Sequence, residues 1–201
     1  GWKSPSSKYE FSPNGTQESF SKDICWDDSS GKYLGNDALQ KALTGSGIKL
    51  LCMDACLMGL VETAYELRKE ITGIEYLVFS QETIPGTGYP YTAIFNDILA
   101  ESDRSPAILA GIIVRDYLGY YGVGSGVTHS AIDLSKISAV VSAINAFTTD
   151  LTGKSQSVLD QARANCEFYS YSTHVDLWGF ADNFTDPSAI ALKAAIRSAV
   201  I

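Results

Sequence analysis

Long apolar runs and basic residues are scarce in this sequence, and each scarcity excludes a class of protein. None of its 201 residues belongs to an uninterrupted apolar run of about 18, so the sequence predicts no membrane-spanning helix. Lys and Arg number 15 against 23 Asp and Glu, a net charge of −8. This balance argues against nucleic acid as a partner, because phosphate binding needs clustered basic side chains. It is compatible with attracting basic peptides.

Cysteine and histidine are also rare. The 4 cysteines form no C-x-x-C pair, and neither of the 2 histidines lies at zinc-ligand spacing from them, so we predict no metal site and no cofactor. So few cysteines in a chain of this size do not make a disulfide framework. The four cysteines are Cys25, Cys52, Cys56 and Cys166. We therefore expect all of them to be free thiols, one reactive and three packed in the core.

The composition, with 45% hydrophobic and 19% charged residues, is that of one ordinary globular domain with a sizeable core. The chain begins at Gly1-Trp2 with no Met and no signal peptide, which leads us to expect a fragment or a processed product. Residues 1–22 are rich in Ser, Pro, Gly and Asn without periodicity, and are expected to form an exposed loop. Residues 23–201 are expected to form an α/β body.

The strongest local pattern lies between Ile48 and Arg68. Residues 48–53 are almost wholly apolar, as expected of a strand buried on both faces of a parallel sheet. From Leu57 the apolar residues recur on one helical face, so Cys56 is expected where a buried strand turns into an amphipathic helix. Sites in open α/β sheets lie at this end of a strand, and a helix N-terminus favours a thiolate. Cys56 is therefore a candidate nucleophile.

The same residues have a purely structural interpretation. A small cysteine at a strand end can simply fill space in the core. Asp54 can be the N-cap of the following helix, because an aspartate there accepts a backbone N–H. Residue types alone leave both interpretations open.

The rest of the chain alternates between strand and helix patterns. This alternation predicts parallel pairing with right-handed crossovers. A glycine-rich run, GVGSGV at 122–127, follows no strand and is interpreted as a turn, not as a phosphate loop. Further strands are expected at 75–80 and 127–134, and helices at 38–43, 90–100, 105–120, 136–150, 155–166 and 187–200.

A resemblance to a known family lies in three neighbouring segments, which read ICWDDSSGKYLGNDALQKAL, DACLMGLVETAYELR and EYLVFSQETIPGTGYPY. They resemble the active-site region of the clostripain-type cysteine endopeptidases of the caspase-like clan, and weaker similarity continues through AIDLSKI and VDLWGFADNF. The resemblance implies a caspase-like three-layer sandwich, a mostly parallel sheet with helices on both faces. Its N-terminal strands would precede Gly1, because the 48–53 strand would otherwise leave an unpaired apolar edge. The chain would then be the C-terminal portion of one peptidase domain.

The resemblance also implies roles for individual residues. Cys56 would form the acyl-enzyme, and Asp54 would lie in the S1 pocket and select Arg or Lys at P1, since a carboxylate pairs well with either cation. Glu82, at the end of the neighbouring strand, is a plausible second acid, with a solvated loop glutamate as the alternative. Backbone N–H groups, including that of Cys56, would hold the oxyanion, and the GTGYPY segment would form a wall of the cleft.

The catalytic base is expected outside this chain. In the family pattern it belongs to a His-Gly-x-Gly-Trp motif, and the chain opens at what resembles the final Gly-Trp, which places the histidine just upstream of Gly1. That N-terminal part would be the partner of this chain within one domain, because a thiol nucleophile needs an imidazole within reach. His129 and His174 match no catalytic motif and are interpreted as structural.

These features predict a cysteine endopeptidase that hydrolyses peptides or proteins after Arg or Lys. We expect a bacterial zymogen that cuts itself in the 1–22 loop, at Lys22 first and Lys8 second, and the family implies a secreted or cell-envelope location. One alternative is a non-catalytic caspase-like homologue that acts as an interaction module. Another is a flavodoxin-like binding domain in which Cys56 is structural.

Overall fold

The computed structural model describes residues 23–27, 29–122, 124–170 and 174–201 of the chain. At its centre lies a three-stranded sheet in the order β3-β4-β5. A separate antiparallel hairpin, which the sequence did not lead us to expect, precedes it. The strands are β1 (Asp23–Asp27), β2 (Lys32–Gly35), β3 (Leu50–Cys52), β4 (Tyr76–Phe79) and β5 (Ser130–Asp133).

Helices account for most of the remaining described residues. The expected helices appear close to their predicted positions, except that the helix after β3 begins later than expected. The short helices α3 and α8 were not expected. The helices are α1 (Asn36–Leu43), α2 (Val61–Glu66), α3 (Lys69–Thr72), α4 (Tyr91–Ala100), α5 (Pro106–Tyr121), η1 (Leu134–Lys136), α6 (Ile137–Leu151), α7 (Gln156–Ala164), α8 (Leu177–Asp182) and α9 (Pro187–Ala199).

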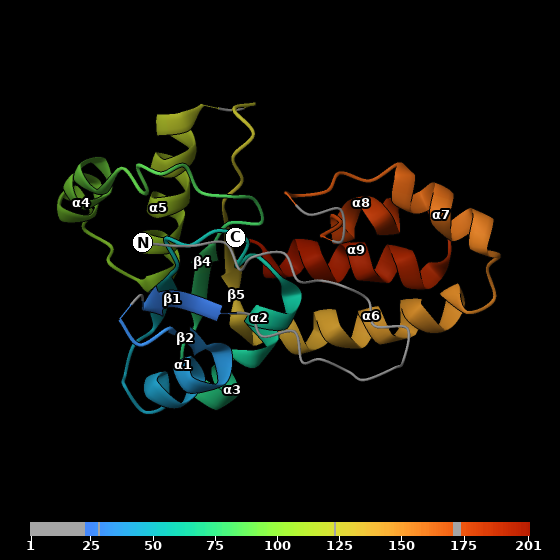
Figure 1. The fold of residues 1–201 in the computed structure, drawn as a ribbon, viewed down its shortest axis with the longest axis horizontal. Coiled ribbons are helices and arrows are strands. Elements are labelled where there is room, and N and C mark those ends of the chain that lie inside the picture. Colours follow the sequence, from blue (N-terminus) through green and yellow to red (C-terminus); the bar gives the residue numbers. More distant parts are fainter. Residues whose placement is uncertain (1–22, 28, 123, 171–173) are drawn as a thin grey trace.

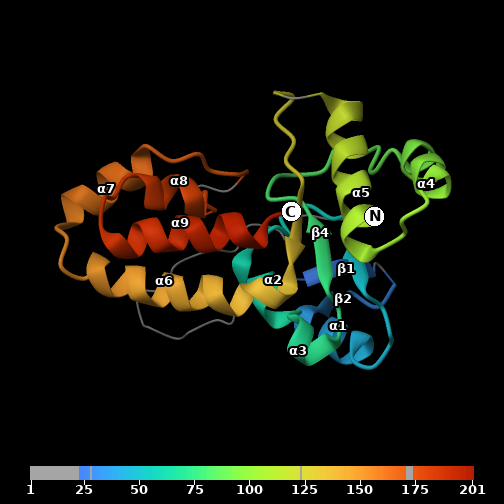
Figure 2. The same cartoon turned by 180° about the vertical axis from the view of Figure 1, so that it is seen from behind.

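The sheet lies between two groups of helices, with α4 and α5 on one face and α2, α6, α8 and α9 on the other (Figures 1 and 2). Successive side chains of a strand point to opposite faces, and β4 is buried on both. Val78 packs in one core with Ile113 of α5, while Leu77 and Phe79 pack in the other with Leu192 of α9. The expected three-layer arrangement, a sheet with helices on both faces, is therefore confirmed.

The pairing of the strands is mixed. β3 and β4 are parallel, with Leu50 opposite Tyr76, as expected from the alternation. β4 and β5 are antiparallel, with Phe79 opposite Ser130, so the expectation of parallel pairing is wrong for this pair.

The reason lies in the two helices between β4 and β5. Because α4 and α5 both intervene, the end of α5 returns to the carboxyl end of β4, where the hydroxyl of Tyr121 donates to the carbonyl of Gly88 (2.6 Å). Beyond it, the carbonyl of Thr128 accepts a hydrogen bond from the Ser80 hydroxyl (2.7 Å). The chain thus enters β5 from the end at which β4 finishes.

The outer edge of β5 carries the last residues of the chain. Ile132 forms an antiparallel bridge with Val200, and the N–H of Ile201 donates to the carbonyl of Ala131 (3.1 Å). On the other side of the sheet, β3 pairs with β4 alone among the described strands. The expectation that further strands precede Gly1 stays a prediction.

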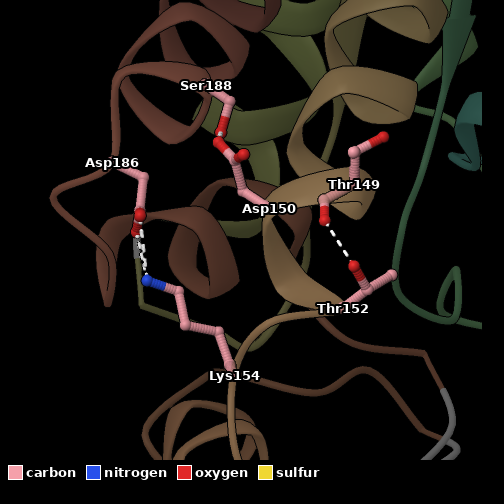
Figure 3. Close-up of polar contacts among 6 residues, drawn as sticks. All are labelled: Thr149, Asp150, Thr152, Lys154, Asp186 and Ser188. Atoms are coloured by element: carbon pink, nitrogen blue, oxygen red, sulfur yellow. Dashed lines mark hydrogen bonds and ion pairs between the residues drawn. The ribbon is translucent and has the colours of Figure 1, made fainter.

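Side-chain contacts fasten the far end of the helical layer formed by α6 and α9 (Figure 3). Lys154, just after α6, donates to both carboxylate oxygens of Asp186, at 2.8 and 2.9 Å. The hydroxyl of Ser188 in α9 donates to Asp150 of α6 (2.5 Å). These contacts hold the two helices in register along the face opposite α5.

Candidate active site

Cys56 lies in the turn that follows β3, and the helix after it, α2, begins only at Val61. The expectation that Cys56 stands at the N-terminus of a helix starting near residue 57 is therefore wrong. Residues 57–60 instead run beside the end of β4. The N–H of Leu57 donates to the carbonyl of Glu82 (3.2 Å), and the N–H of Gly59 to that of Ser80 (2.7 Å).

The backbone geometry of this turn explains why a helix cannot start there. A Cβ at position 59 would lie 2.6 Å from the backbone nitrogen of Gln81, so only glycine allows this close approach. Leu57 has a φ of 60°, in the left-handed region, which costs a non-glycine residue about 1–3 kcal/mol. Backbone strain of this kind clusters at functional sites. A glycine inside the apparent helical pattern was the sequence signal for this break.

The loop after β4 contacts the side chain of Cys56. Sγ of Cys56 is half-buried and accepts a hydrogen bond from the N–H of Ile84 (3.2 Å). The other thiols whose side chains are described are poor nucleophiles: burial raises the pKa of Cys52 to about 12, and burial followed by the charge of Asp176 raises that of Cys166. Cys56 is the described thiol that faces a loop at the carboxyl edge of the sheet, where α/β proteins build their sites.

Asp54 lies in the same turn and contacts the same loop. Its Oδ2 accepts hydrogen bonds from the hydroxyl of Tyr91 (2.6 Å) and from the N–H of Tyr89 (3.3 Å). A Cβ at Gly88 would lie 2.7 Å from this oxygen, which explains the glycine there. The residue at the N-cap of α2 is Leu60, with no side-chain cap bond, so the alternative of Asp54 as that cap is wrong.

The GTGYPY segment (residues 86–91) is hydrogen-bonded to its surroundings at its middle, through Gly88 and Tyr89. The hydroxyl of Tyr89 donates to the carbonyl of Met53 (2.9 Å), and the hydroxyl of Tyr121 donates to the carbonyl of Gly88 (2.6 Å). From the sequence, Tyr89 and Tyr91 were expected only as parts of a shaped loop. Their hydrogen bonds to the turn of Cys56 were missed, because the partners lie far apart along the chain.

Glu82 points toward a later segment of the chain. Its carboxylate accepts hydrogen bonds from the N–H groups of Thr83 (2.6 Å) and Ser170 (3.0 Å) and from the hydroxyl of Ser170. Burial alone would raise the pKa of Glu82, but these hydrogen bonds outweigh it and lower the pKa. Most of its acceptor sites are occupied. Its role as a second acid of the S1 pocket stays a prediction.

The two histidines lie apart from the contacts of Cys56 described above. His129 is 7% exposed, stacks on the ring of Tyr117 at 4.3 Å between centroids, and meets Tyr89 edge-on at 5.0 Å. Burial lowers its pKa to about 4, so it is neutral at physiological pH. His174 is half-buried, and its carbonyl accepts the N–H of Tyr169 (3.0 Å). The structural role of both histidines stays a prediction.

The described residues offer neither a metal site nor a membrane-spanning helix. Among them, no cluster of His, Cys, Asp or Glu side chains is able to hold a metal ion. Nor does any helix in that part of the chain have the length and apolarity to cross a bilayer. Lys8 and Lys22, the candidate cleavage sites, lie outside the described residues, as does Gly1-Trp2.

Solved structures define the class of protein to which this fold belongs. A cysteine protease from B. fragilis superimposes with a TM-score of 0.66 at 21% identity, over 89% of this chain and 76% of its own. A secreted C11 cysteine protease from Bacteroides thetaiotaomicron, in complex with an irreversible peptide inhibitor, gives 0.64 at 24% identity, over 87% of this chain and 50% of its own. The fold is that of the caspase-like C11 cysteine proteases.

Sequence comparison then gives the family. Residues 13–196 match the model of the Clostripain family, Peptidase C11, and the chain belongs to that family. Clostripain from Hathewaya histolytica is 39% identical over 88 residues, which cover 38% of this chain and 16% of clostripain. The matched segment is thus a small part of that relative. The flavodoxin-like alternative is wrong.

Proposed function

We propose that this chain carries the nucleophile and the P1 pocket of a cysteine endopeptidase that cleaves after Arg or Lys. The observation that carries the proposal is that one loop contacts both functional side chains. Ile84 donates to Sγ of Cys56, and Tyr89 and Tyr91 donate to the carboxylate of Asp54. A substrate carbonyl at Cys56 and a P1 cation at Asp54 would therefore lie beside the same wall.

The reaction follows from the chemistry of a thiol nucleophile. An imidazole takes the proton of the Cys56 thiol, Sγ attacks the scissile carbonyl, and backbone N–H groups, including that of Cys56, hold the oxyanion that forms. The peptide C–N bond then breaks, and an imidazole gives the departing amine its proton. Water hydrolyses the thioester and releases the acid. The imidazole is the one that the family resemblance places before Gly1.

The specificity rests on charge. A basic P1 side chain leaves water when it binds, and it needs a counter-charge there. Asp54 supplies a carboxylate at the edge of the loop, and Glu82 is a second acid within the same loop. Because Ser170 and Thr83 donate to Glu82, Asp54 is the main counter-charge and Glu82 the lesser one.

The protein is made as a zymogen and cuts itself before the first strand. Lys22 directly precedes Asp23, where β1 begins, so a cut there separates the loop from the hairpin without breaking a strand. Lys8 is the second candidate. Since one of the similar structures is a secreted protease, export from the cell is part of this proposal.

A covalent probe tests the activity directly. A peptide with P1 Arg and an electrophilic carbonyl is expected to label the complete protein once, at Cys56. Cys56→Ala is expected to abolish labelling, and Cys52→Ala, which removes a thiol of raised pKa, is expected to retain it. A complete protein that contains the upstream histidine and yet takes up no label would favour the non-catalytic interaction module.

A further inference from the structure

The two carboxylate oxygens of Asp54 have different surroundings. Oδ2 accepts two hydrogen bonds, from the Tyr91 hydroxyl at 2.6 Å and from the Tyr89 N–H at 3.3 Å. Among the described residues, no donor lies within hydrogen-bonding distance of Oδ1. A carboxylate oxygen has about two lone-pair sites. Within the described part of the chain, Oδ2 therefore has both of its lone-pair sites occupied and Oδ1 has no donor.

Tyr91 is held in the position from which it donates. It is the first residue of α4, and its ring stacks on that of Phe95, one turn further on, at 6.2 Å and 21°. The hydrogen bond to Asp54, followed by partial burial, raises the pKa of Tyr91 to about 12, so its hydroxyl keeps its proton at neutral pH. A hydroxyl that donates to a carboxylate makes one of the stronger hydrogen bonds of proteins.

We propose that Tyr91 is a positioning residue that sets the balance between Arg and Lys at P1, by occupying one of the two oxygens of Asp54. This inference rests on the proposed function, in which Asp54 receives the P1 cation. A guanidinium pairs best with a carboxylate through two parallel N–H donors, one to each oxygen. An ammonium is a compact point charge and needs only one oxygen.

The consequence is a pocket in which a P1 arginine cannot form the two parallel hydrogen bonds that would favour it over lysine. With Oδ2 occupied, an arginine side chain makes a single charge-assisted bond to Oδ1, as a lysine does. Removing the Tyr91 hydroxyl leaves Oδ2 with only the longer bond from Tyr89 and opens a site for the second guanidinium donor. Lysine gains nothing from that change.

The test is Tyr91→Phe in the complete protein, which keeps the aromatic stack with Phe95 and removes only the hydroxyl. The values of kcat/KM are measured for three peptides that differ only in P1: Arg, Lys and Gln. The Arg-to-Lys ratio is expected to rise about 5- to 10-fold, the effect of one added hydrogen bond. The P1 Gln peptide reports any change in catalysis that does not depend on the P1 charge. The Arg-to-Lys ratio does not depend on how much of the variant is folded.

Tyr120→Phe is the matched control. Tyr120 lies near the end of α5, is 64% exposed, and has only a ring contact, with Tyr121, among its described contacts. The Arg-to-Lys ratio of kcat/KM in Tyr120→Phe is expected to equal that of the wild type. An unchanged or lowered ratio in Tyr91→Phe would overturn the role of Tyr91 while leaving the basic specificity in place. A wild-type protein that cleaves after Gln as well as after Arg and Lys would overturn the proposed function, and this inference with it.

Discussion

The backbone N–H of Ile84 donates to Sγ of Cys56 across 3.2 Å and joins the turn after β3 to the loop after β4. The same loop supplies the donors to Asp54 through Tyr89 and Tyr91. Cys56 and Asp54 are therefore positioned relative to each other by one segment. This segment is itself held in place by the hydrogen bonds from the Tyr89 hydroxyl to the carbonyl of Met53 and from the Tyr121 hydroxyl to the carbonyl of Gly88.

Replacing Cys56 by Ala is expected to lower peptidase turnover by ~10³-fold or more, because no other group can form the acyl-enzyme. The melting temperature is expected to change little, since the side chain is only half-buried. Steady-state cleavage of a P1-Arg peptide and a thermal melt of the same sample check both statements. Cys52→Ala is the control and retains turnover. Activity that survives in Cys56→Ala would assign the chemistry to another residue.

Replacing Asp54 by Asn is expected to remove most of the preference for basic P1 residues, by ~10²- to 10³-fold in kcat/KM, because the bound cation loses its counter-charge. Asparagine keeps an oxygen that can accept from Tyr91 and Tyr89, so the loop is expected to stay in place. The measurement compares P1 Arg with P1 Gln peptides. Glu82→Gln is the matched control and is expected to have a much smaller effect. If Glu82→Gln loses more specificity than Asp54→Asn, the main acid of the pocket is Glu82.

The sequence predicted the two parallel strands beside the candidate site but described the turn that follows the first of them incorrectly. The apolar run before Met53 predicted the strand, and the later strand at 75–80 predicted its parallel neighbour. The helix was placed too early because Leu57 and Leu60 fit a helical face, whereas Leu57 has left-handed backbone and Gly59 lies against the backbone of Gln81. Periodicity within one segment cannot report such a contact between two strands.

The tyrosines around Asp54 were beyond sequence reasoning for a similar reason. Tyr89 and Tyr91 lie 35 and 37 positions after Asp54, and their contacts depend on how a loop of glycines and prolines folds back. The antiparallel entry of β5 likewise follows from where α5 ends, as the contact of Tyr121 with Gly88 indicates. Local patterns predicted the sheet strands and the longer helices, and tertiary contacts determined how these elements pack.

The buried His129 predicts a pH dependence of stability. Its pKa falls from 6.5 to about 4 on folding, chiefly through burial, against weaker opposing effects of Thr128 and Asp54. Between these values the unfolded chain binds a proton that the folded chain does not. The free energy of unfolding attributable to this group is therefore complete above pH 6.5 and is lost as the pH falls toward 4, by up to ~3 kcal/mol.

His129→Phe tests this pH dependence, because phenylalanine keeps a ring against Tyr117 and Tyr89 and cannot titrate. Urea unfolding is measured for both proteins between neutral pH and about pH 5. The wild type is expected to lose more stability than the variant over this range. Carboxylates are common to both proteins, so they cancel in the comparison. Parallel profiles would mean that His129 carries its proton equally well in the folded protein.

Self-cleavage is expected in the segment before β1. The basic residues ahead of Lys32 are Lys3, Lys8 and Lys22, and Lys22 lies directly before the first strand residue, Asp23. A bond within the hairpin is a poor substrate, because a peptidase needs an extended chain free of strand pairing. Lys22 is therefore the first site and Lys8, in SPSSKYEF, the second.

N-terminal sequencing after incubation of the complete protein tests this order. A new start at Asp23 is expected, and a start at Tyr9 would indicate Lys8 instead. Lys22→Gln is expected to slow activation, while Lys32→Gln, at the start of the paired strand β2, is the matched control and leaves it unchanged. The Cys56→Ala protein is expected to stay intact, because the cut is its own. Full activity with no cleavage anywhere before Lys32 would show that the enzyme is not made as a zymogen cut in this segment.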